Sequence, residues 1–286
     1  MGGLGNQLFQ YALGRRLSLL RDAELKLDLS YYALKNVGTI REYQLNLFNI
    51  KEKFATNEEI SYFTGDYSNP IQRVQYQFRR LFEKNIITVE KKLFVYDPDV
   101  ITSKNSYFDG YWQNQKYFEP IKNILISDFS LRNPLSGSLI QLENEIINSD
   151  SICLHVRRGD LISNNKARLF LGFSDISYYL QAVENIAKDV YSPSFYIFSD
   201  DISWCKENIK LKFPVKFVSE LTQDSISDDF WLMTRCKHYI IPNSTFSWWA
   251  AWLNQGAHKI VVAPERWVND PNTDYSDFIP QNWRKL

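Results

Sequence analysis

The residues Ile152-Cys153-Leu154-His155-Val156, followed directly by Arg157-Arg158-Gly159-Asp160, decide the fold class of this chain. The first five form a short, almost wholly apolar run, which is typical of a strand buried on both faces of a parallel sheet. Apolar residues then recur at helical spacing between Ile176 and Ala187. The stretch therefore predicts a strand, a polar loop and a helix, which is the opening of an α/β unit.

The same alternation continues to residue 263. Strands that alternate with helices predict a parallel, doubly wound sheet, and such sheets bind ligands beyond the carboxyl ends of their strands. The further strands are expected at 195–198, 215–218, 238–241 and 260–263, and the further helices at 202 onward, 230–236 and 244–253.

The first half of the chain is less regular. A turn-rich stretch, Asn133 to Ser138, is followed by a further helical pattern, and we place the domain boundary after it, giving domains 1–147 and 148–286. A glycine loop that opens a helix normally follows a strand, but no strand precedes Gly2-Gly3 here, so the first strand of the N-terminal domain is expected to be missing. The elements expected in this half are helices at 4–20, 116–128 and 139–147 and strands at 24–29 and 107–112.

Composition excludes several classes of protein. Thirty-three Lys and Arg residues balance 33 Asp and Glu residues, so the clustered positive charge that nucleic-acid binding requires is not indicated. Three cysteines without C-x-x-C spacing argue against a disulfide framework and a zinc site. No apolar run is long enough for a membrane span and no signal peptide opens the chain, so we expect a cytoplasmic protein.

Two arginines end the first strand of the second half. A guanidinium group stays charged and grips phosphate oxygens with two parallel hydrogen bonds, so Arg157 and Arg158 are candidates for binding a diphosphate. The alternative is a structural salt bridge from one of them to Asp160.

A second polar cluster, Pro242 to Trp249, follows the strand expected at 238–241. Asn243 or Ser244 can cap the following helix, and the N–H groups of a helix start form an anion site. Ordinary capping is the alternative. Trp248 and Trp249 are expected to pack the helix.

The opening glycine stretch is the third cluster. Gly3 and Gly5 allow the backbone to approach a ligand, and the amides of Asn6 and Gln7 can bind sugar or phosphate oxygens. The stretch does not match a dinucleotide fingerprint, because position 8 is not glycine.

Two carboxylate pairs raise the question of a metal. Asp97-Pro98-Asp99 has the D-x-D form that divalent ions accept, but Asp-Pro-Asp is also common turn chemistry, which we favour. The second pair, Asp200-Asp201, follows the strand at 195–198, and a divalent ion would accept it too. The alternatives for Asp200 are that it meets a nucleotide or caps the next helix.

Four blocks in this order resemble the α-1,2-fucosyltransferase family, which is glycosyltransferase family 11. The blocks are residues 2–11, 155–160, 198–201 and 243–249, and the resemblance runs from residue 2 to about 265. The H-x-R-R-x-D block is shared with α-1,6- and protein O-fucosyltransferases, whereas the N-S-T-F-S-W-W block is specific to the α-1,2 family.

This resemblance implies a GT-B architecture, with two Rossmann-like domains facing across a cleft. It implies inverting transfer of L-fucose from GDP-fucose to the 2-hydroxyl of a terminal galactose of an oligosaccharide, without a cofactor or divalent metal. It further suggests peripheral association with a bacterial inner membrane. The predicted site comprises catalytic Arg157, Arg158 and Asp160, a donor pocket of His155, Asp200, Asn243, Ser244, Thr245 and Phe246, and a cleft-facing loop with Gly3, Gly5, Asn6 and Gln7.

Some points stay open from sequence. Family members often carry His-Gly before a pair of tyrosines, where this chain has Leu171-Gly172. No catalytic base is assigned; Asp160, Asp175 and the Asp228-Asp229 pair are the carboxylates considered. The rival functions are fucosyl transfer to another position, a non-catalytic sugar- or nucleotide-binding protein, and a metal-dependent transferase of the GT-A type.

Overall fold

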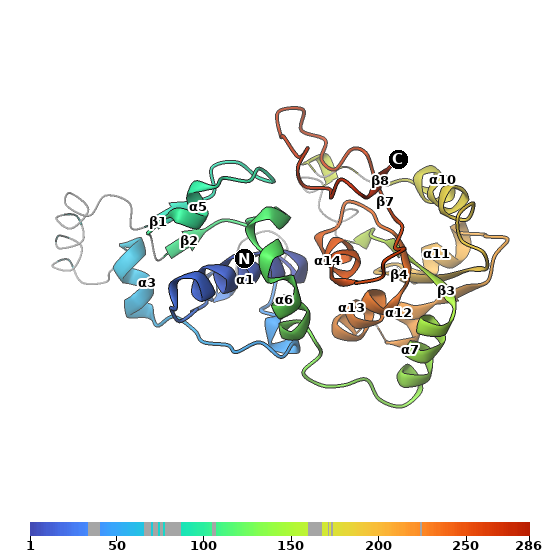
Figure 1. The fold of residues 1–286 in the computed structure, drawn as a ribbon, viewed down its shortest axis with the longest axis horizontal. Helices are drawn as coiled ribbons and strands as arrows, with labels where there is room; N and C mark the ends of the chain where they lie inside the picture. Colours follow the sequence, from blue (N-terminus) through green and yellow to red (C-terminus); the bar gives the residue numbers. More distant parts are fainter. Residues whose placement is uncertain are drawn as a thin grey trace. The chain divides into compact units, whose positions relative to one another are not determined.

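The chain folds into two compact units, which a computed structural model describes for residues 1–33, 41–65, 70, 74, 77, 87–104, 107–159, 168–170, 172, 174–223 and 225–286 (Figure 1). Unit 1 comprises Met1–Asn46 and Ile50–Ile121, and unit 2 comprises Leu47–Asn49 and Lys122–Leu286. Helices α6 (Lys122–Asp128) and α7 (Ser138–Asn148) therefore belong to unit 2. The predicted boundary at residue 147 had placed them in the first domain.

Unit 2 is built on a six-stranded sheet in which every neighbouring pair is parallel. Its order is β5-β4-β3-β6-β7-β8, so the chain winds outward from β3 to one edge and then returns to β6 beside β3. This is the 3-2-1-4-5-6 order of doubly wound nucleotide-binding folds, whose ligand crevice lies where the winding reverses. The strands are β3 (Asp150–Val156), β4 (Pro193–Ser199), β5 (Val215–Phe217), β6 (His238–Ile240), β7 (Val261–Ala263) and β8 (Arg284–Lys285).

The alternation of side chains along β3 fixes which helices it contacts. Ile152, Leu154 and Val156 lie in one buried core with apolar residues of α10 and α11. Cys153 and His155 point to the opposite face, because successive side chains of a strand alternate. The helices after β3 whose bounds lie within the described residues are α10 (Ile176–Ile186), α11 (Ile202–Asn208), α12 (Val218–Leu221), α13 (Ile226–Arg235) and α14 (Thr245–Leu253).

Helix α14 is apolar all round. Trp248 and Trp249 are fully buried, and the ring of Trp248 stacks on Trp252 and Phe278. A helix that is apolar on every face must be covered on every face, so α14 is fixed rigidly in its unit. The predicted packing role of these tryptophans is confirmed.

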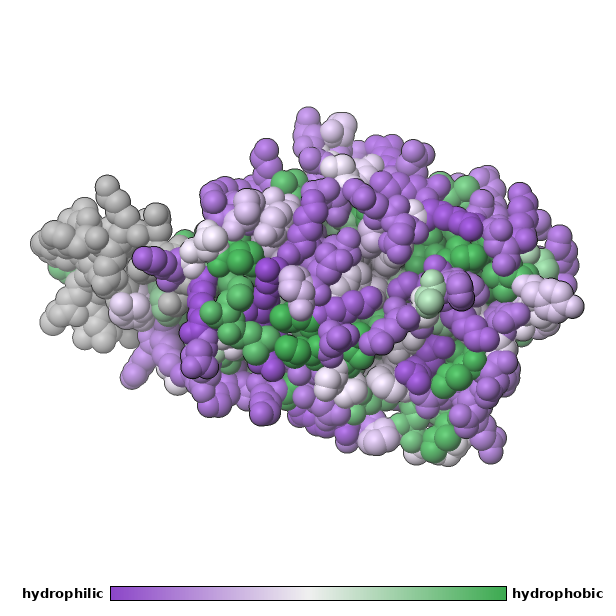
Figure 2. Space-filling view, viewed as in Figure 1, coloured by the Kyte–Doolittle hydropathy of each residue, from purple (hydrophilic) through white to green (hydrophobic). Residues whose placement is uncertain are grey.

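On the face shown in Figure 2, hydrophobic residues form separate patches among hydrophilic ones.

Unit 1 is organised around one long helix, α1 (Leu4–Arg21). Its described strands, β1 (Ile87–Val89) and β2 (Tyr107–Asp109), pair in parallel as a two-stranded sheet. The other elements with bounds in the described part of unit 1 are α2 (Ser30–Ala33), η1 (Leu45–Leu47, which ends in unit 2), α3 (Asn57–Thr64), α5 (Asp99–Thr102), η2 (Gln115–Tyr117) and η3 (Glu119–Ile121).

Two predictions for the first half were wrong. The strand expected at 24–29 is only an isolated bridge between Leu27 and Phe54. The helix expected at 116–128 is divided into η2, η3 and α6, and Pro120 lies in η3. Proline lacks the N–H and clashes with the preceding turn, so a continuous helix cannot run through this position. Within the described ranges, no helix combines the length and apolar character that crossing a bilayer requires.

Candidate active site

Arg157 connects the two strand ends at which the winding of the sheet reverses. It follows β3 directly, and its Nη1 donates to the carbonyl oxygen of Asn243, beyond the end of β6, at 3.3 Å. Because β3 and β6 are adjacent, their carboxyl ends lie side by side at the switch point, where doubly wound sheets have their ligand crevice; we refer to this place as the crevice. The guanidinium of Arg157 therefore lies where this class of sheet binds its ligand.

Arg158 is held on the opposite side of the same loop. Its Nε donates to the Asp201 carboxylate at 3.1 Å, and its guanidinium carbon lies 3.9 Å from the centre of the Trp204 ring. The side chain is only 15% exposed. Arg158 therefore forms a salt bridge with Asp201. The predicted partner, Asp160, lies outside the described residues, so a salt bridge to it stays a prediction; Leu171 also lies outside them.

Asp200 fixes the backbone of this loop. Its two carboxylate oxygens accept the N–H groups of Arg158 at 2.8 Å and Gly159 at 2.9 Å. A Cβ atom at position 159 would lie 3.0 Å from the Asp200 carboxylate, so glycine permits this close approach. The predicted contact of Asp200 with the donor stays a prediction; the structure gives its carboxylate a positioning role.

His155 is buried between β3 and α14. Its Nδ1 lies 2.8 Å from the hydroxyl of Ser247, and its ring centre is 5.8 Å from that of Phe246. Burial, and then the nearby charge of Arg157, lower the pKa of His155 to about 3. The imidazole is therefore neutral at physiological pH, and it joins β3 to the first turn of α14 rather than supplying a charge.

The N-terminus of α14 borders the same crevice from the β6 side. Ser244 is the N-cap residue, and its hydroxyl makes no cap hydrogen bond to the described first turn. Thr245 and Phe246 follow and are half-buried. The first N–H groups of a helix have no intrahelical acceptor and carry partial positive charge, so this end favours an anion.

The opening residues of the chain form a helix start in unit 1. Gly3 precedes α1, while Gly5, Asn6 and Gln7 lie in its first turn, so the predicted loop is helical. Gly2 has φ +79°, and a Cβ atom there would meet the side chain of Asn6 at 2.5 Å. The buried amide of Gln7 is used within the unit, where it bonds to three backbone groups, the carbonyls of Gly2 and Glu42 and the N–H of Gln44.

The carboxylates considered from sequence cap local structure. Asp97 accepts the N–H of Asp99 at 3.0 Å just before α5, which confirms the turn interpretation. Asp175 is the N-cap of α10, and Asp229 accepts hydrogen bonds from two hydroxyl groups in unit 2. Asp228 lies in the first turn of α13. Among the described residues, no three or more His, Cys, Asp or Glu side chains gather as metal ligands would.

Sequence reasoning missed two residues that support the crevice. The Trp204 ring stacks against the Arg158 guanidinium, and the Tyr178 hydroxyl donates to the carbonyl of Ile241 at 2.6 Å, at the end of β6. Trp204 comes three residues after the capping Asp201, and this spacing is a signal for a contact in the first helical turn.

Comparison with known proteins gives consistent matches over the chain. The model of "Glycosyl transferase family 11" matches residues 70–286. An alpha-1,2-colitosyltransferase of Escherichia coli is 34% identical over 292 residues, covering 100% of this chain and 96% of that protein. The O-antigen biosynthesis glycosyltransferase WbnK of Escherichia coli is 33% identical over 301 residues, covering 100% and 98%.

A solved structure has the same fold. The crystal structure of the fucosyltransferase NodZ from Bradyrhizobium is similar with a TM-score of 0.50 at 13% identity, covering 87% of this chain and 89% of that one.

Proposed function

The chain belongs to glycosyl transferase family 11 and is a glycosyltransferase, and from this premise we propose that it transfers L-fucose from GDP-fucose to the 2-hydroxyl of a terminal galactose of an oligosaccharide. The observation that carries the donor side of this proposal is the crevice at the β3 and β6 ends. There, the guanidinium of Arg157 and the N-terminus of α14 supply positive charge from two adjacent strand ends.

The chemistry follows from this charge. The acceptor oxygen forms a bond to C1 of the sugar while the bond between C1 and the β-phosphate oxygen breaks, so the configuration at C1 inverts. Negative charge develops on the departing GDP, and donors already fixed in place stabilise it without reorganising. We assign this stabilisation to Arg157, with Arg158 and Asp200 holding its loop.

We propose that the acceptor hydroxyl releases its proton to water late in a loose transition state, and we assign no side chain as its base. Asp175 and Asp229 already accept hydrogen bonds within unit 2, and Asp160 lies outside the described residues. Our proposal is that Asp160 is structural and that departure of GDP, rather than proton transfer, dominates the barrier.

The relatives support the linkage and suggest a second candidate donor. The relative at 34% identity over the whole chain is named an alpha-1,2-colitosyltransferase, which supports transfer to a 2-hydroxyl. Colitose is L-fucose without the 3-hydroxyl, so GDP-colitose is the alternative donor. A site that hydrogen-bonds a substrate hydroxyl strongly rejects the analogue that lacks it, so the two donors are separable by rate.

We also propose that the reaction needs no divalent metal, and that the enzyme works in the cytoplasm in peripheral contact with the inner membrane. Fractionation of cells that express the chain tests the location. We expect the protein to be recovered with the membranes and to be released from them by a salt wash. Recovery only in the salt-free supernatant would contradict the membrane contact.

The proposed function is tested with a panel of donors and acceptors. Purified protein is incubated with GDP-fucose or GDP-colitose and with oligosaccharides that end in galactose, and the product linkage and anomeric configuration are determined by NMR. We expect α-1,2-linked fucose as the main product. Transfer to another hydroxyl would contradict the linkage, and faster transfer of colitose would contradict the donor.

A further inference from the structure

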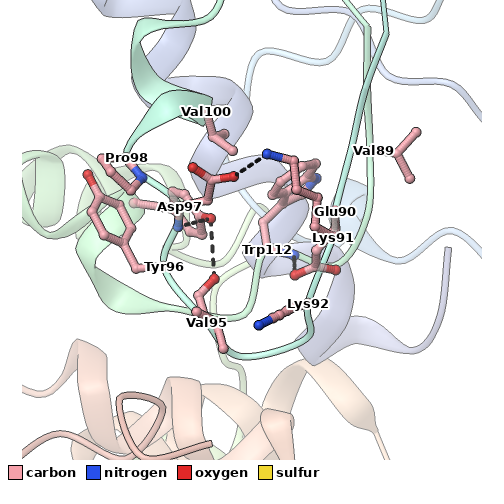
Figure 3. Close-up of a pocket in the computed structure, with 11 residues that line it drawn as sticks. Val89, Glu90, Lys91, Lys92, Val95, Tyr96, Asp97, Pro98, Val100 and Trp112 are labelled. Carbon is pink, nitrogen blue, oxygen red and sulfur yellow. Dashed lines mark hydrogen bonds and ion pairs between the residues drawn. The ribbon is translucent and has the colours of Figure 1, made fainter. Parts of the chain in front are cut away.

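Unit 1 contains a cavity that the proposed donor site does not use. It lies beside β1 and α5, has a volume of about 240 Å³, and its described lining belongs wholly to unit 1 (Figure 3). Residues that matter for its chemistry are Glu90, Lys91, Lys92, Tyr96, Asp97 and Trp112.

Aromatic rings form much of its wall. Tyr117 is buried, and its ring centre lies 4.9 Å from that of the half-buried Tyr96 and 5.9 Å from that of Trp112. The Tyr117 hydroxyl accepts the N–H of Asp97 at 2.8 Å, so the ring cannot turn away from the cavity without losing this bond. An apolar wall with a few fixed polar groups is typical of a small-molecule site.

The wall is held in an unusual backbone conformation. Phe94 has φ +66° and Trp112 has φ +59°, a region that bulky side chains rarely adopt. The side chain of the buried Asn114 donates to the Phe94 carbonyl at 2.8 Å, and the Glu90 carboxylate accepts the N–H of Trp112 at 3.0 Å. Strained conformations that the surroundings enforce concentrate at binding sites, and here they preform the cavity.

The charges around the cavity are largely balanced. The Lys91 Nζ lies 3.1 Å from the Asp97 carboxylate. The partly buried Glu90 carboxylate accepts hydrogen bonds from the backbone N–H groups of Tyr111 and Trp112. Lys92 is exposed, and the structure gives it no hydrogen bond or ion pair with any described residue. Figure 3 shows Lys92 near Val95 at the cavity. Lysine offers three N–H donors and no acceptor, which suits the oxygens of a hydroxylated ligand.

We propose that this cavity binds one neutral sugar unit of the acceptor oligosaccharide, a unit other than the galactose that receives fucose. The volume is below the roughly 300–1,000 Å³ of pockets for drug-sized ligands, so it suits a single sugar ring. Aromatic walls contact the C–H face of such a ring, while Lys92 binds its hydroxyl oxygens. The inference rests on the proposed function, because that function supplies an oligosaccharide ligand.

The test compares acceptors of different length. KM is measured for a simple β-galactoside and for a galactose-terminated tetrasaccharide, with wild type, Lys92→Ala and Val95→Trp, the last of which adds a large side chain to the cavity lining. Lys104→Ala is the matched control, because Lys104 is an exposed lysine of unit 1 that does not line the cavity. Both cavity variants should raise KM for the tetrasaccharide about fivefold or more, with kcat, KM for GDP-fucose and KM for the simple galactoside unchanged.

A binding measurement separates failure of this inference from failure of the proposed function. Saturation-transfer NMR of the tetrasaccharide with the protein alone should show a non-terminal unit in contact in wild type and lose this contact in both variants. Absence of transfer from every donor, with this contact present, would contradict only the proposed function. Active enzyme whose cavity variants keep wild-type KM for the tetrasaccharide and wild-type NMR contacts would overturn the inference.

Discussion

Unit 2 and unit 1 place their polar side chains by different means. In unit 2 the order of a parallel sheet brings Arg157 and Asn243, which are far apart in sequence, to adjacent strand ends. In unit 1 single buried amides, those of Gln7 and Asn114, hold stretches of backbone that belong to no extended sheet. In unit 2, therefore, strand order places the positive charge that we propose binds the donor. In unit 1 the backbone conformation depends on individual hydrogen bonds.

The largest expected effect separates the two arginines of unit 2. Arg157→Ala should lower kcat/KM by about 10²–10³, the usual loss when one fixed donor to a developing anion is removed. The hydrogen bond of Arg157 to the Asn243 carbonyl is long, at 3.3 Å, so we expect the melting temperature to fall less than in Arg158→Ala. Steady-state kinetics with GDP-fucose and calorimetry measure both quantities.

Arg158→Ala should lower stability more than Arg157→Ala does and lower the rate less. Loss of the Asp201 pair and the Trp204 contact is expected to lower stability by about 1–2 kcal/mol, with a smaller loss of rate than at Arg157. Arg284→Ala, an exposed arginine of the same sheet, is the control. Equal loss of rate in both variants of the pair would remove the distinction between a binding and a positioning arginine.

In unit 1 the matching test is Gln7→Ala. It leaves the N–H of Gln44 and two carbonyl groups without their buried partner, which should lower the free energy of unfolding by about 2–3 kcal/mol. Gln10→Ala is the control, because the side chain of Gln10 bonds only to Met1 among the residues that the structure describes. Unfolding in urea checks this; equal stability of the two variants would show that the buried amide is not decisive.

His155 makes the stability of unit 2 depend on pH, with a smaller expected effect than the Gln7 substitution. Its pKa is about 3 in the folded chain against an ordinary 6.5, so the unfolded chain binds more protons between these values. Stability is fully present above pH 6.5 and is lost as the pH falls toward 3, by about 1.5 kcal/mol between pH 6.5 and 5. His155→Asn should lack this contribution. A parallel loss of stability in both proteins over this range would disprove the assignment.

The smallest expected effect concerns metal. Activity should persist within about twofold in excess chelator, because Arg157 and the α14 N-terminus supply positive charge. The carboxylate of Asp97, the alternative metal ligand, accepts the N–H of Asp99 and forms an ion pair with Lys91. Activity that chelator abolishes and Mn²⁺ restores would favour the metal-dependent rival.

The two units also differed in how far sequence predicted them. In unit 2 most strands and helices follow the hydrophobic pattern, because β3, β4, β6 and β7 are largely buried and helices such as α10 and α13 bury one face. Two elements were missed: α12 begins at Val218, which was expected in a strand, and β8 lies beyond the last predicted strand. The pattern placed Arg157, Asp200 and Ser244 at strand or helix ends, but it could not distinguish Arg157 from Arg158, because the Trp204 and Asp201 contacts depend on α11.

In unit 1 the same reasoning was weaker. Alternating leucines suggested a strand at 24–29, but only Leu27 finds a partner, so local pattern without a neighbouring strand was insufficient. The cavity beside Trp112 was not predicted at all, because it depends on two residues with positive φ that no sequence signal marks. The predicted Rossmann-like character of this domain and its cleft toward the other stay predictions.

The central claim is that the crevice at the β3 and β6 ends holds the diphosphate of the donor. A crystal structure of the protein with GDP tests it most directly. We expect the diphosphate in hydrogen-bond contact with the Arg157 guanidinium and the first turn of α14, at Thr245 and Phe246. A diphosphate bound away from both, for example at the start of α1 alone, would contradict it.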